Sequence, residues 1–294
     1  MSDTAANDAP SQPRRTSLAP THEALGATMT DFAGWWMPLR YGSEIAEHKA
    51  VRAAAGLFDL GHMGQIDVRG LGAGAALDYA LVGELSTLRY GKAKYSMICA
   101  PDGGVLDDLV VYRLAEDHYL VIANAANRDL VAAELAGRAA DFDATVDLRD
   151  EHRAGLIAIQ GPAAAGIVED AIGESVDGLA YYACRPAAVV AAGGAPVLLA
   201  RTGYTGEDGF ELFCQAADAP AIWADLTQRG APAGLAPTGL SCRDSLRLEA
   251  GMPLYGHELT RDGDPYEAGL GRVVRLDKPG GFVGEAALRD RSVA

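Results

Sequence analysis

Two periods of apolar residues divide the chain into predicted helices and strands. Apolar residues that recur every three or four positions are typical of a helix with one buried face, and alternation at every second position is typical of a half-buried strand. The first pattern predicts helices, the earliest with Ser43 as its N-cap, over residues 43–60, 72–82, 126–142, 217–230 and 239–252. The second predicts strands over residues 64–70, 103–112 and 117–126, and two more around a glycine-rich loop within residues 195–214.

Strands and helices are interleaved, yet the strand over residues 64–70 carries polar side chains at every second position. Gln65, Asp67 and Arg69 alternate there with apolar residues. Strands of a parallel sheet that is covered on both faces are nearly all apolar, so this alternation predicts one wet face. The pattern favours an α+β fold built mainly from antiparallel sheets with helices.

One strand-to-helix segment occurs twice. Residues 66–81 (IDVRGLGAGAALDYAL) resemble residues 156–172 (LIAIQGPAAAGIVEDAI), since each is a strand that ends in glycine and continues into an alanine-rich helix. This repeat, at a spacing of roughly 90 residues, predicts two related halves, the second beginning near residue 150. Residues 264–294 are expected to form a loop, a strand and the start of a further element.

The charge balance restricts the class of partner. The 294 residues include 40 acidic and 25 basic side chains, which leaves a net charge of −15 at pH 7. Such a protein is not expected to coat nucleic acid or an anionic membrane surface, although a local basic pocket can still hold an acidic substrate. The four cysteines are scattered and have no histidine at metal-binding spacing, so they predict neither disulfides nor a metal site.

The N-terminal segment contains the paired residues Arg14 and Arg15, which raises the question of an export signal. No apolar region follows the two arginines, and no later stretch is long and apolar enough to span a bilayer. Residues 1–17 are therefore expected to be a disordered tail on a cytoplasmic protein.

Two motifs have a simpler explanation than a binding site. Gly70, Gly72 and Ala75 satisfy the G-x-G-x-x-A spacing of dinucleotide-binding loops, but the half-polar strand before them is unlike the buried first strand of that fold. A tight turn into a helix is favoured instead. His62 lies in a Leu-Gly-His-Met-Gly turn without a second histidine at ligand spacing, and is interpreted as a turn residue with satisfied ring nitrogens.

Charged side chains gather on the glycine-rich hairpin and on the helix that follows it. On the helix, Arg243 and Arg247 are four positions apart and therefore lie on one side. Surface ion pairs are one explanation for them, and an arginine directed at a polar ligand is the other. The hairpin carries five side chains that favour a site over an ordinary wide turn: Arg201, Tyr204, Glu207, Asp208 and Glu211.

The segment GGVLDDLVVY, residues 103–112, places two adjacent carboxylates in a strand. Period two puts Asp108 on one face with Val110 and Tyr112, and Asp107 on the other face with apolar residues only. Burying an unpaired carboxylate is expensive, and the ligand-facing side of a strand usually mixes polar anchors with apolar walls. Periodicity therefore favours Asp108 as a pocket residue and leaves Asp107 as a structural or solvent-facing residue.

Six segments form an ordered set over nearly all of residues 20–290: GLFDLGHMG, YSMICAPDGGVLDDLVVY, LVIANAAN, RTGYTGEDGFELF, CRDSLRLEAGMPLYGHEL and EAGLGRVVRLDK. In this order they closely resemble the aminomethyltransferase (T-protein) family of the glycine cleavage system. An iron–sulfur-assembly relative normally carries K-G-C-x-x-G-Q-E where this chain has RLEAGMPLYGHEL, so that relative is disfavoured.

The resemblance implies an enzyme, an aminomethyltransferase. Its implied reaction moves the methylene carbon of an aminomethyl group from the lipoyl arm of a partner H-protein to tetrahydrofolate, with release of ammonia. Tetrahydrofolate is thus the implied co-substrate and the H-protein the implied partner, and no metal is implied. Such a reaction needs two large partners held in place and a carboxylate in a partly apolar slot to stabilise positive charge.

The family's functional residues carry over motif by motif. The second aspartate of the Asp-Asp pair, Asp108, corresponds to the catalytic carboxylate. A glutamate suits the aminopyrimidine edge of folate, and an arginine suits its tail or ring oxygen. The implied folate contacts are Met63, Tyr95, Tyr112, Asn124, Tyr204, Glu211 and Arg243. Gly61 stands where the family usually has serine, which is a small change.

The resemblance also divides the chain into parts. It implies two folate-binding subdomains, over residues 18–148 and 149–255, the second ferredoxin-like, and a return segment over residues 256–294 that packs on the first. The family continues from there into a C-terminal β-barrel domain, which the chain as given is expected to lack. Two other functions stay open: a folate-binding or H-protein-binding module without catalysis, and a related folate-dependent demethylase.

Overall fold

Helices surround the strands of this protein. The computed structural model describes residues 12–292. The helices are α1 (Ala19–Ala24), α2 (Glu44–Ala53), α3 (Ala73–Ala80), α4 (Arg128–Arg138), α5 (Ala164–Ile172), α6 (Ala219–Gly230), α7 (Leu240–Glu249) and α8 (Glu285–Arg291), with 3-10 turns at Ala231–Ala233 and Gly271–Val273.

The strands of residues 12–292 form three sheets, and their pairing confirms the predicted α+β class with mainly antiparallel sheets. The first sheet is antiparallel throughout and has the order β6 (Lys92–Cys99), β7 (Val105–Ala115), β8 (His118–Ala123), β5 (Gly64–Arg69), β9 (Thr145–Leu148). The second sheet has the order β11 (Cys184–Val189), β12 (Ala195–Ala200), β13 (Gly209–Cys214), β10 (Gly155–Gln160), β4 (Ala55–Asp59), β14 (Leu235–Pro237). A small third sheet contains β1 (Arg14–Arg15), β3 (Trp35–Arg40) and β2 (Thr28–Phe32).

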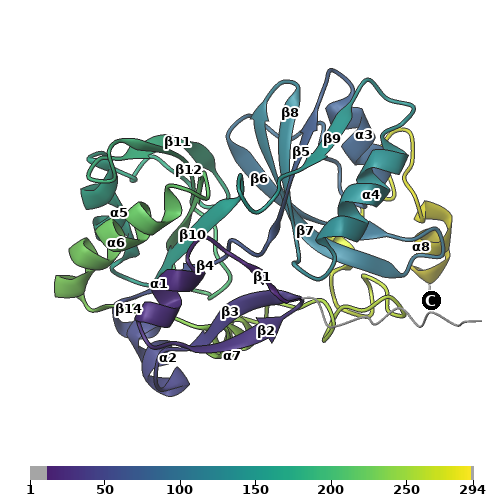
Figure 1. Ribbon diagram of the computed structural model, residues 1–294. Coiled ribbons are helices and arrows are strands. Elements are labelled where there is room, and N and C mark those ends of the chain that lie inside the picture. The colour runs from purple at the N-terminus through teal and green to yellow at the C-terminus, as the bar shows by residue number, and fades with distance from the viewer. Residues whose placement is uncertain (1–11, 293–294) are drawn as a thin grey trace, which may run out of the picture.

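The first and second sheets pack face to face, and each has its own helices on the outer face. Helices α3 and α4 cover the first sheet, and α5 and α6 cover the second (Figure 1). Phe58, Leu120, Leu156 and Phe213 form part of the core between the sheets. Burying a side chain of this size contributes about 1.5–3 kcal/mol to the stability of the fold. Inward-pointing residues of both halves therefore meet in one interface.

The predicted repeat is present, once in each sheet. Strand β5 leads through Gly70 into α3, and β10 leads through Gly161 into α5, with φ angles of +126° and +131°. A Cβ at Gly70 would lie 2.2 Å from the carbonyl oxygen of Asp143, and one at Gly161 would lie 2.5 Å from that of Ala54. Both positions therefore need glycine. Gly70 forms the tight turn favoured from the sequence, because the chain at Asp143 lies against it.

The helix predicted over residues 43–60 is shorter than expected. Ser43 is the N-cap, as predicted, and its Oγ accepts a hydrogen bond from the amide of Ala46 at 3.4 Å. The helix ends at Ala53, and the apolar residues that follow form β4, where Leu57 pairs with Ile159 of β10. Pairing in the second sheet thus overrides a helical continuation that the sequence alone allowed.

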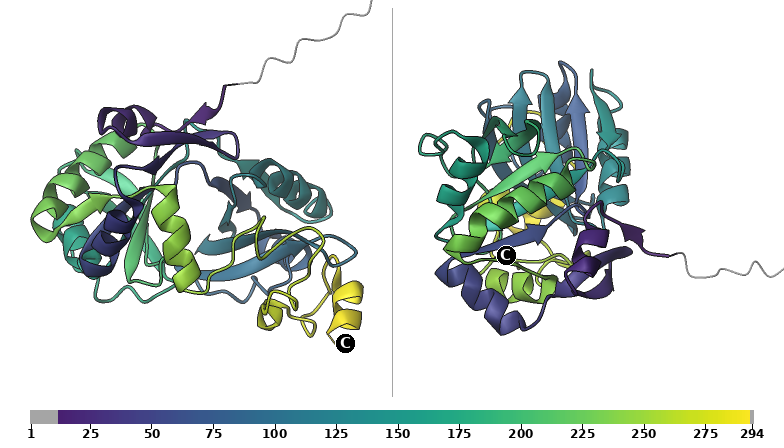
Figure 2. Two further views of the ribbon diagram at one scale, coloured as in Figure 1. Left: turned by 90° about the horizontal axis from the view of Figure 1, so that it is seen from below. Right: turned by 60° about the vertical axis from the view of Figure 1, so that its left-hand side comes forward.

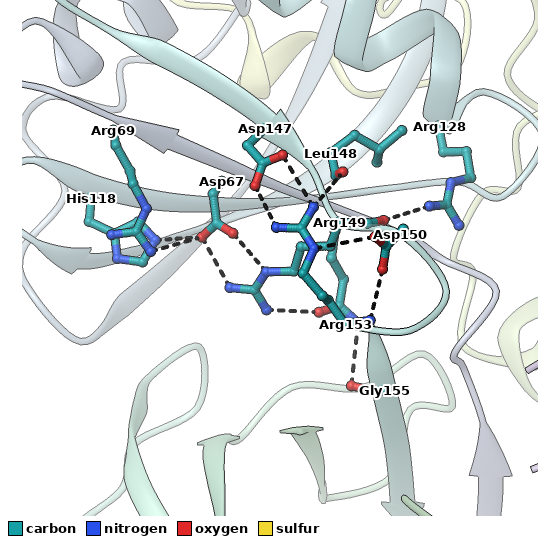
Figure 3. Close-up of polar contacts among 11 residues, drawn as sticks. Asp67, Arg69, His118, Arg128, Asp147, Leu148, Arg149, Asp150, Arg153 and Gly155 are labelled. Carbon is teal, nitrogen blue, oxygen red and sulfur yellow. Dashed lines mark hydrogen bonds and ion pairs between the residues drawn. The ribbon is translucent and has the colours of Figure 1, made fainter. Parts of the chain in front are cut away.

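The prediction of a wet face on β5 is wrong, because that strand is buried on both faces. Gln65 is 0% exposed and Asp67 is 5% exposed. Arg149 binds both oxygens of Asp67, at 2.7 and 3.0 Å, and His118 Nε2 lies 2.6 Å from Asp67 Oδ1 (Figure 3). Arg149 is 82 positions away from Asp67, so the alternation revealed a polar face but not its partner.

The predicted disordered tail does not extend through residues 12–17. Arg14 and Arg15 form β1, which pairs in parallel with Trp35 and Trp36, and the Arg14 guanidinium lies 5.8 Å from the centre of the Trp35 ring. Thr16 donates a hydrogen bond of 2.6 Å to Asp59. These contacts order the segment against β3. The remainder of the predicted tail, residues 1–11, lies outside the described residues.

The last described segment packs on the first sheet. Leu259, Phe282 and Leu288 share an apolar cluster with Met97 of β6 and Val105 of β7, and Figure 2 shows α8 beside this sheet. The strand predicted within residues 264–294 is absent from the described part of this segment, where a 3-10 turn occurs at Gly271–Val273. The apolar side chains there contribute to packing rather than to strand pairing.

Candidate active site

A cavity of about 760 Å³ lies where the first and second sheets meet α7 and the β2–β3 hairpin. This volume is in the range of ligand pockets for compounds of drug or cofactor size. All of the site residues expected from the sequence line it: Met63, Tyr95, Asp108, Tyr112, Asn124, Tyr204, Glu211 and Arg243. Residues from both halves of the chain are thus brought into one site.

Asp108 lies on the cavity side of β7, together with Val110 and Tyr112, as the alternation predicted. Its Oδ2 accepts a hydrogen bond of 3.0 Å from the Tyr95 hydroxyl, and its Oδ1 accepts one of 2.8 Å from Asn124 Nδ2. Burial raises the pKa of Asp108, although these two hydrogen bonds oppose the rise. No lysine or arginine forms an ion pair with it within residues 12–292. The Asp108 carboxylate is therefore held by neutral donors and has no cationic partner in residues 12–292.

Asp107 points to the opposite face and is 0% exposed, so the solvent-facing alternative for it is wrong and the structural one is right. Its carboxylate accepts hydrogen bonds from the Asn124 amide nitrogen at 2.9 Å, from Asn124 Nδ2 at 2.9 Å and from Asn127 Nδ2 at 2.8 Å. Burial raises the pKa of Asp107 to about 7, with the Asn127 bond opposing the rise and the charge of Asp108 adding to it.

A hydrogen-bonded trio joins the two sheets across the cavity wall. The Thr202 hydroxyl donates to Glu211 Oε2 at 2.6 Å, and the Tyr112 hydroxyl donates to the same oxygen at 3.2 Å. Within residues 12–292, no hydrogen bond reaches Glu211 Oε1. One oxygen of this cavity-lining carboxylate is therefore held by the protein, and the other is available to N–H donors of a ligand.

The two arginines of α7 differ, although both line the cavity. Arg247 is 2% exposed and pairs with Asp244 at 2.8 Å and with Glu258 at 2.6 Å, which agrees with the ion-pair explanation. Arg243 forms no ion pair within residues 12–292, and its guanidinium lies 4.6 Å from the centre of the Tyr204 ring. Burial lowers the pKa of Arg243. Arg243 is thus the arginine available to a polar or anionic ligand.

Only part of the glycine-rich hairpin belongs to the site. Tyr204 and Glu211 line the cavity, whereas Arg201 and Asp208 pair with each other at 2.7 Å. Glu207 pairs with Arg52 of α2 at 2.9 Å. The charged residues at the tip of the hairpin therefore hold its shape, and two of its five candidate side chains reach the cavity.

The interpretation of His62 as a satisfied turn histidine is wrong. Its ring lines the cavity, packs edge-on against Phe32 at 5.7 Å between centres, and has a buried Nδ1 without a hydrogen-bond partner in residues 12–292. Burial lowers the pKa of His62 to about 4, so the imidazole is neutral at physiological pH. The turn sequence gave no sign of this, because the surrounding groups come from distant segments.

Some cavity residues could not be found by sequence reasoning. Tyr182 lines the cavity with a positive φ of 57°, an uncommon conformation for tyrosine, and lies in the connection between α5 and β11. Phe32, at the tip of the β2–β3 hairpin, and Tyr255 also line it. None of these residues belongs to a period or a spacing that points to a ligand. They line one cavity because the tertiary fold brings separate segments of the chain together.

Residues 12–292 contain no group of three or more His, Cys, Asp or Glu side chains arranged to hold a metal ion. No helix in this part of the chain has both the length and the apolar character required to cross a membrane.

Comparisons with known proteins identify the family of this chain. The model of the GCVT N-terminal domain family matches residues 18–278. An aminomethyltransferase of Streptomyces avermitilis is 60% identical over 95% of this chain and 74% of its own length, and one of Cutibacterium acnes is 53% identical over 95% and 76%. The solved glycine cleavage system aminomethyltransferase T of Bartonella henselae superposes with a TM-score of 0.86 at 36% identity, covering 95% of this chain and 75% of that one. The chain belongs to the aminomethyltransferase family, a family of transferases of the glycine cleavage system.

Proposed function

We propose that the protein transfers the methylene carbon of an aminomethyl group from the lipoyl arm of H-protein to tetrahydrofolate. The bond between the lipoyl sulfur and the methylene carbon breaks, the carbon becomes bonded to two folate nitrogens, and ammonia leaves. Of the two hydrogens lost from these nitrogens, one completes ammonia and the other completes the lipoyl thiol. Tetrahydrofolate supplies the nucleophile, so the protein needs to orient its partners and to stabilise charge.

The cavity residues fit a folate-sized co-substrate. The cavity, with a volume of about 760 Å³, is large enough for such a molecule. Its walls combine tyrosines and aliphatic residues with a few polar groups. Glu211 offers its free Oε1 to the N–H groups of an aminopyrimidine. Arg243, held against the Tyr204 ring, offers its guanidinium to a ring oxygen or to the acidic tail. Met63, Tyr95, Tyr112 and Asn124 complete the expected contacts.

Asp108 is the observation that carries the proposal. Its carboxylate lies in a partly apolar cavity, is oriented by Tyr95 and Asn124, and has no cationic partner in residues 12–292. A fixed negative charge of this kind interacts strongly with positive charge that develops on the transferred carbon and on the folate nitrogens. We therefore assign Asp108 as the catalytic residue.

The test is a turnover assay with aminomethylated H-protein and tetrahydrofolate, in which ammonia and methylenetetrahydrofolate are measured together. We expect both products in equal amounts. The Asp108→Asn variant is expected to lose roughly 100- to 1000-fold in turnover, the usual effect of removing one electrostatic contact to a transition state. Full turnover by that variant would disprove the assignment.

Asp147→Asn is a matched control, because Asp147 lies in the same sheet on β9 but is exposed and does not line the cavity. It is expected to leave turnover unchanged. Binding of tetrahydrofolate without ammonia release would favour a non-catalytic binding module. Product formed from a methylated donor instead of aminomethylated H-protein would favour a folate-dependent demethylase.

A further inference from the structure

We propose, on the basis of the function above, that Asp107 is a positioning residue for the reaction: it fixes the Asn124 amide so that this amide holds Asp108 in place. Asp107 does not line the cavity, and its carboxylate is fully buried on the opposite face of β7. It therefore acts through Asn124 and not by contact with a substrate.

The hydrogen bonds determine the orientation of Asn124. Asp107 Oδ2 accepts a hydrogen bond of 2.9 Å from the Asn124 backbone amide, and Asp107 Oδ1 accepts one of 2.9 Å from Asn124 Nδ2. Asp107 therefore binds both the backbone and the side chain of Asn124. The same Nδ2 donates to Asp108 Oδ1 at 2.8 Å. Since both neighbours are carboxylates, the Asn124 side chain must turn its NH₂ group toward them. Asp107 thus excludes the flipped amide, in which a carbonyl oxygen would face Asp108.

The donors to Asp107 extend the link to helix α4. Asn127, the N-cap residue of α4, donates to Asp107 Oδ1 at 2.8 Å and is itself buried. Asp107 therefore connects the start of α4 to Asp108 through two amides. A displacement of about 1 Å at a reacting group can reduce the rate about 100-fold. The hydrogen bonds of Asn127 and Asn124 with the two aspartates therefore keep the Asp108 carboxylate in the position that the reaction needs.

Asp107 and Asp108 also interact electrostatically. A negative charge on Asp108 makes proton loss from the adjacent, buried Asp107 less favourable. The titratable groups near the pair come from several elements: Tyr95 of β6, Tyr182 and Tyr204 of the loops on the second half, and Tyr255 of the last segment. The tyrosines are neutral over the working pH range, because burial raises the pKa of each of them. The charge of Asp108 is therefore the neighbouring charge that helps to raise the pKa of Asp107 to about 7.

Asp107→Asn is the test, with kcat, KM for tetrahydrofolate and the pH dependence of kcat measured together. We expect kcat to fall roughly 10- to 100-fold through misplacement of Asp108, with KM changed less than about threefold. Because the pKa of Asp107 is about 7, replacing it with an amide removes a titration near neutral pH, so the acid limb of the kcat profile should move to lower pH. An effect on folding alone would move neither the limb nor kcat per folded molecule.

Asp67→Asn is the matched control, since Asp67 is a buried aspartate of the same sheet that does not line the cavity. It is expected to leave the pH profile unchanged. If Asp107→Asn does not fold, Asn127→Ala removes one donor from Asp107 without touching Asn124, and a several-fold fall in kcat is expected. Unchanged kcat and an unchanged acid limb in the folded variants would overturn the proposal.

Failure of the proposed function is recognised separately, because the wild-type protein itself would then release no ammonia. In that case the pH dependence of tetrahydrofolate binding, followed by protein fluorescence, replaces the kcat profile. The Asp107→Asn variant is still expected to shift the acid limb of binding to lower pH, and coincident binding curves would overturn the inference.

Discussion

Two sets of carboxylates in the first sheet have opposite kinds of partner. Asp67 on β5 is bound by Arg149 through two hydrogen bonds and contacts His118, with Arg69 3.5 Å away. Asp107 and Asp108 on β7 receive only amide and phenol donors in the described part of the chain. Burial alone would raise the pKa of Asp67, but the hydrogen bonds from His118 and Arg149 hold it well below its usual range, whereas burial raises the pKa of Asp107 to about 7.

The difference distinguishes a carboxylate with a cationic partner in the protein from the carboxylate that we propose to be catalytic. At Asp67 the protein supplies the positive charge, so the interaction is complete without a ligand. At Asp108 the described residues supply hydrogen bonds but no cation, and in the proposed function a cationic group of the substrate completes the interaction. The contrast is between the partners of the carboxylates, since β5 and β7 belong to the same sheet.

The largest effect is expected when Asp108 is given a cationic partner, as Asp67 has in Arg149. Asn124→Lys places an ammonium group within reach of both Asp107 and Asp108 and neutralises them from within the protein. Turnover is expected to fall at least about 100-fold, because the charge that the reaction needs is already satisfied. The assay is methylenetetrahydrofolate formation, with thermal unfolding measured alongside to show that the variant is folded.

Asn124→Gln is the control for loss of the native amide without a new charge. It should retain more activity than the lysine variant and should lack the stabilisation that a paired charge gives. Equal turnover in the two variants would show that the uncompensated charge is not what distinguishes β7 from β5.

A smaller effect, on stability instead of activity, is expected for Asp67→Asn. The change leaves Arg149 and His118 without their carboxylate in a buried setting, which should lower the free energy of unfolding by about 2–4 kcal/mol. Turnover per folded molecule at a temperature below the transition should change less than about twofold. Urea unfolding at pH 7 measures the first quantity.

The pH dependence of the loss in free energy of unfolding on Asp67→Asn shows whether that loss comes from the charge of Asp67. The folded-state pKa of Asp67 is depressed, so its stabilising contribution is present above the unfolded value of about 4 and is lost as pH falls through the folded value. The difference in free energy of unfolding between wild type and Asp67→Asn should therefore become smaller below about pH 4. A difference that is constant from pH 7 to pH 3 would assign the loss to packing instead.

The smallest effect is expected at the exposed edge of the same cluster. Arg153 pairs with Asp147 at 2.7 Å, but their side chains are 44% and 58% exposed (Figure 3). Arg153→Ala should change the free energy of unfolding by no more than about 0.5 kcal/mol, because solvent screens such pairs. A loss as large as that of Asp67→Asn would mean that the whole cluster acts as one unit.

Features encoded by neighbouring residues were predictable from the sequence. The alternation along β7 separates Asp107 from Asp108, the glycine of the repeated segment marks both strand-to-helix turns, and Ser43 caps α2. The family resemblance added Met63, Tyr95 and Asn124 and implied that Glu211 and Arg243 contact folate. The fold brings all five residues to one cavity. Their individual functions stay predictions until the variants are measured.

Features that depend on distant partners were missed or misjudged. His62 was expected to be satisfied, and its Nδ1 is buried without a partner in residues 12–292. Asp67 was expected to face water, yet Arg149 covers it from the chain that leads into β10. Tyr182 carries no periodic signal and reaches the cavity through the packing of the two halves.

The sequence by itself determined the class of fold, the face of β7 that each aspartate occupies and the family, because these depend on periodicity and on local motifs. The tertiary structure decided which carboxylates have a cation and which do not. Charge compensation requires that side chains from separate strands meet within a few ångströms, and periodicity holds no information about that. Asp108 is a candidate catalytic residue because the fold orients it and leaves its charge free.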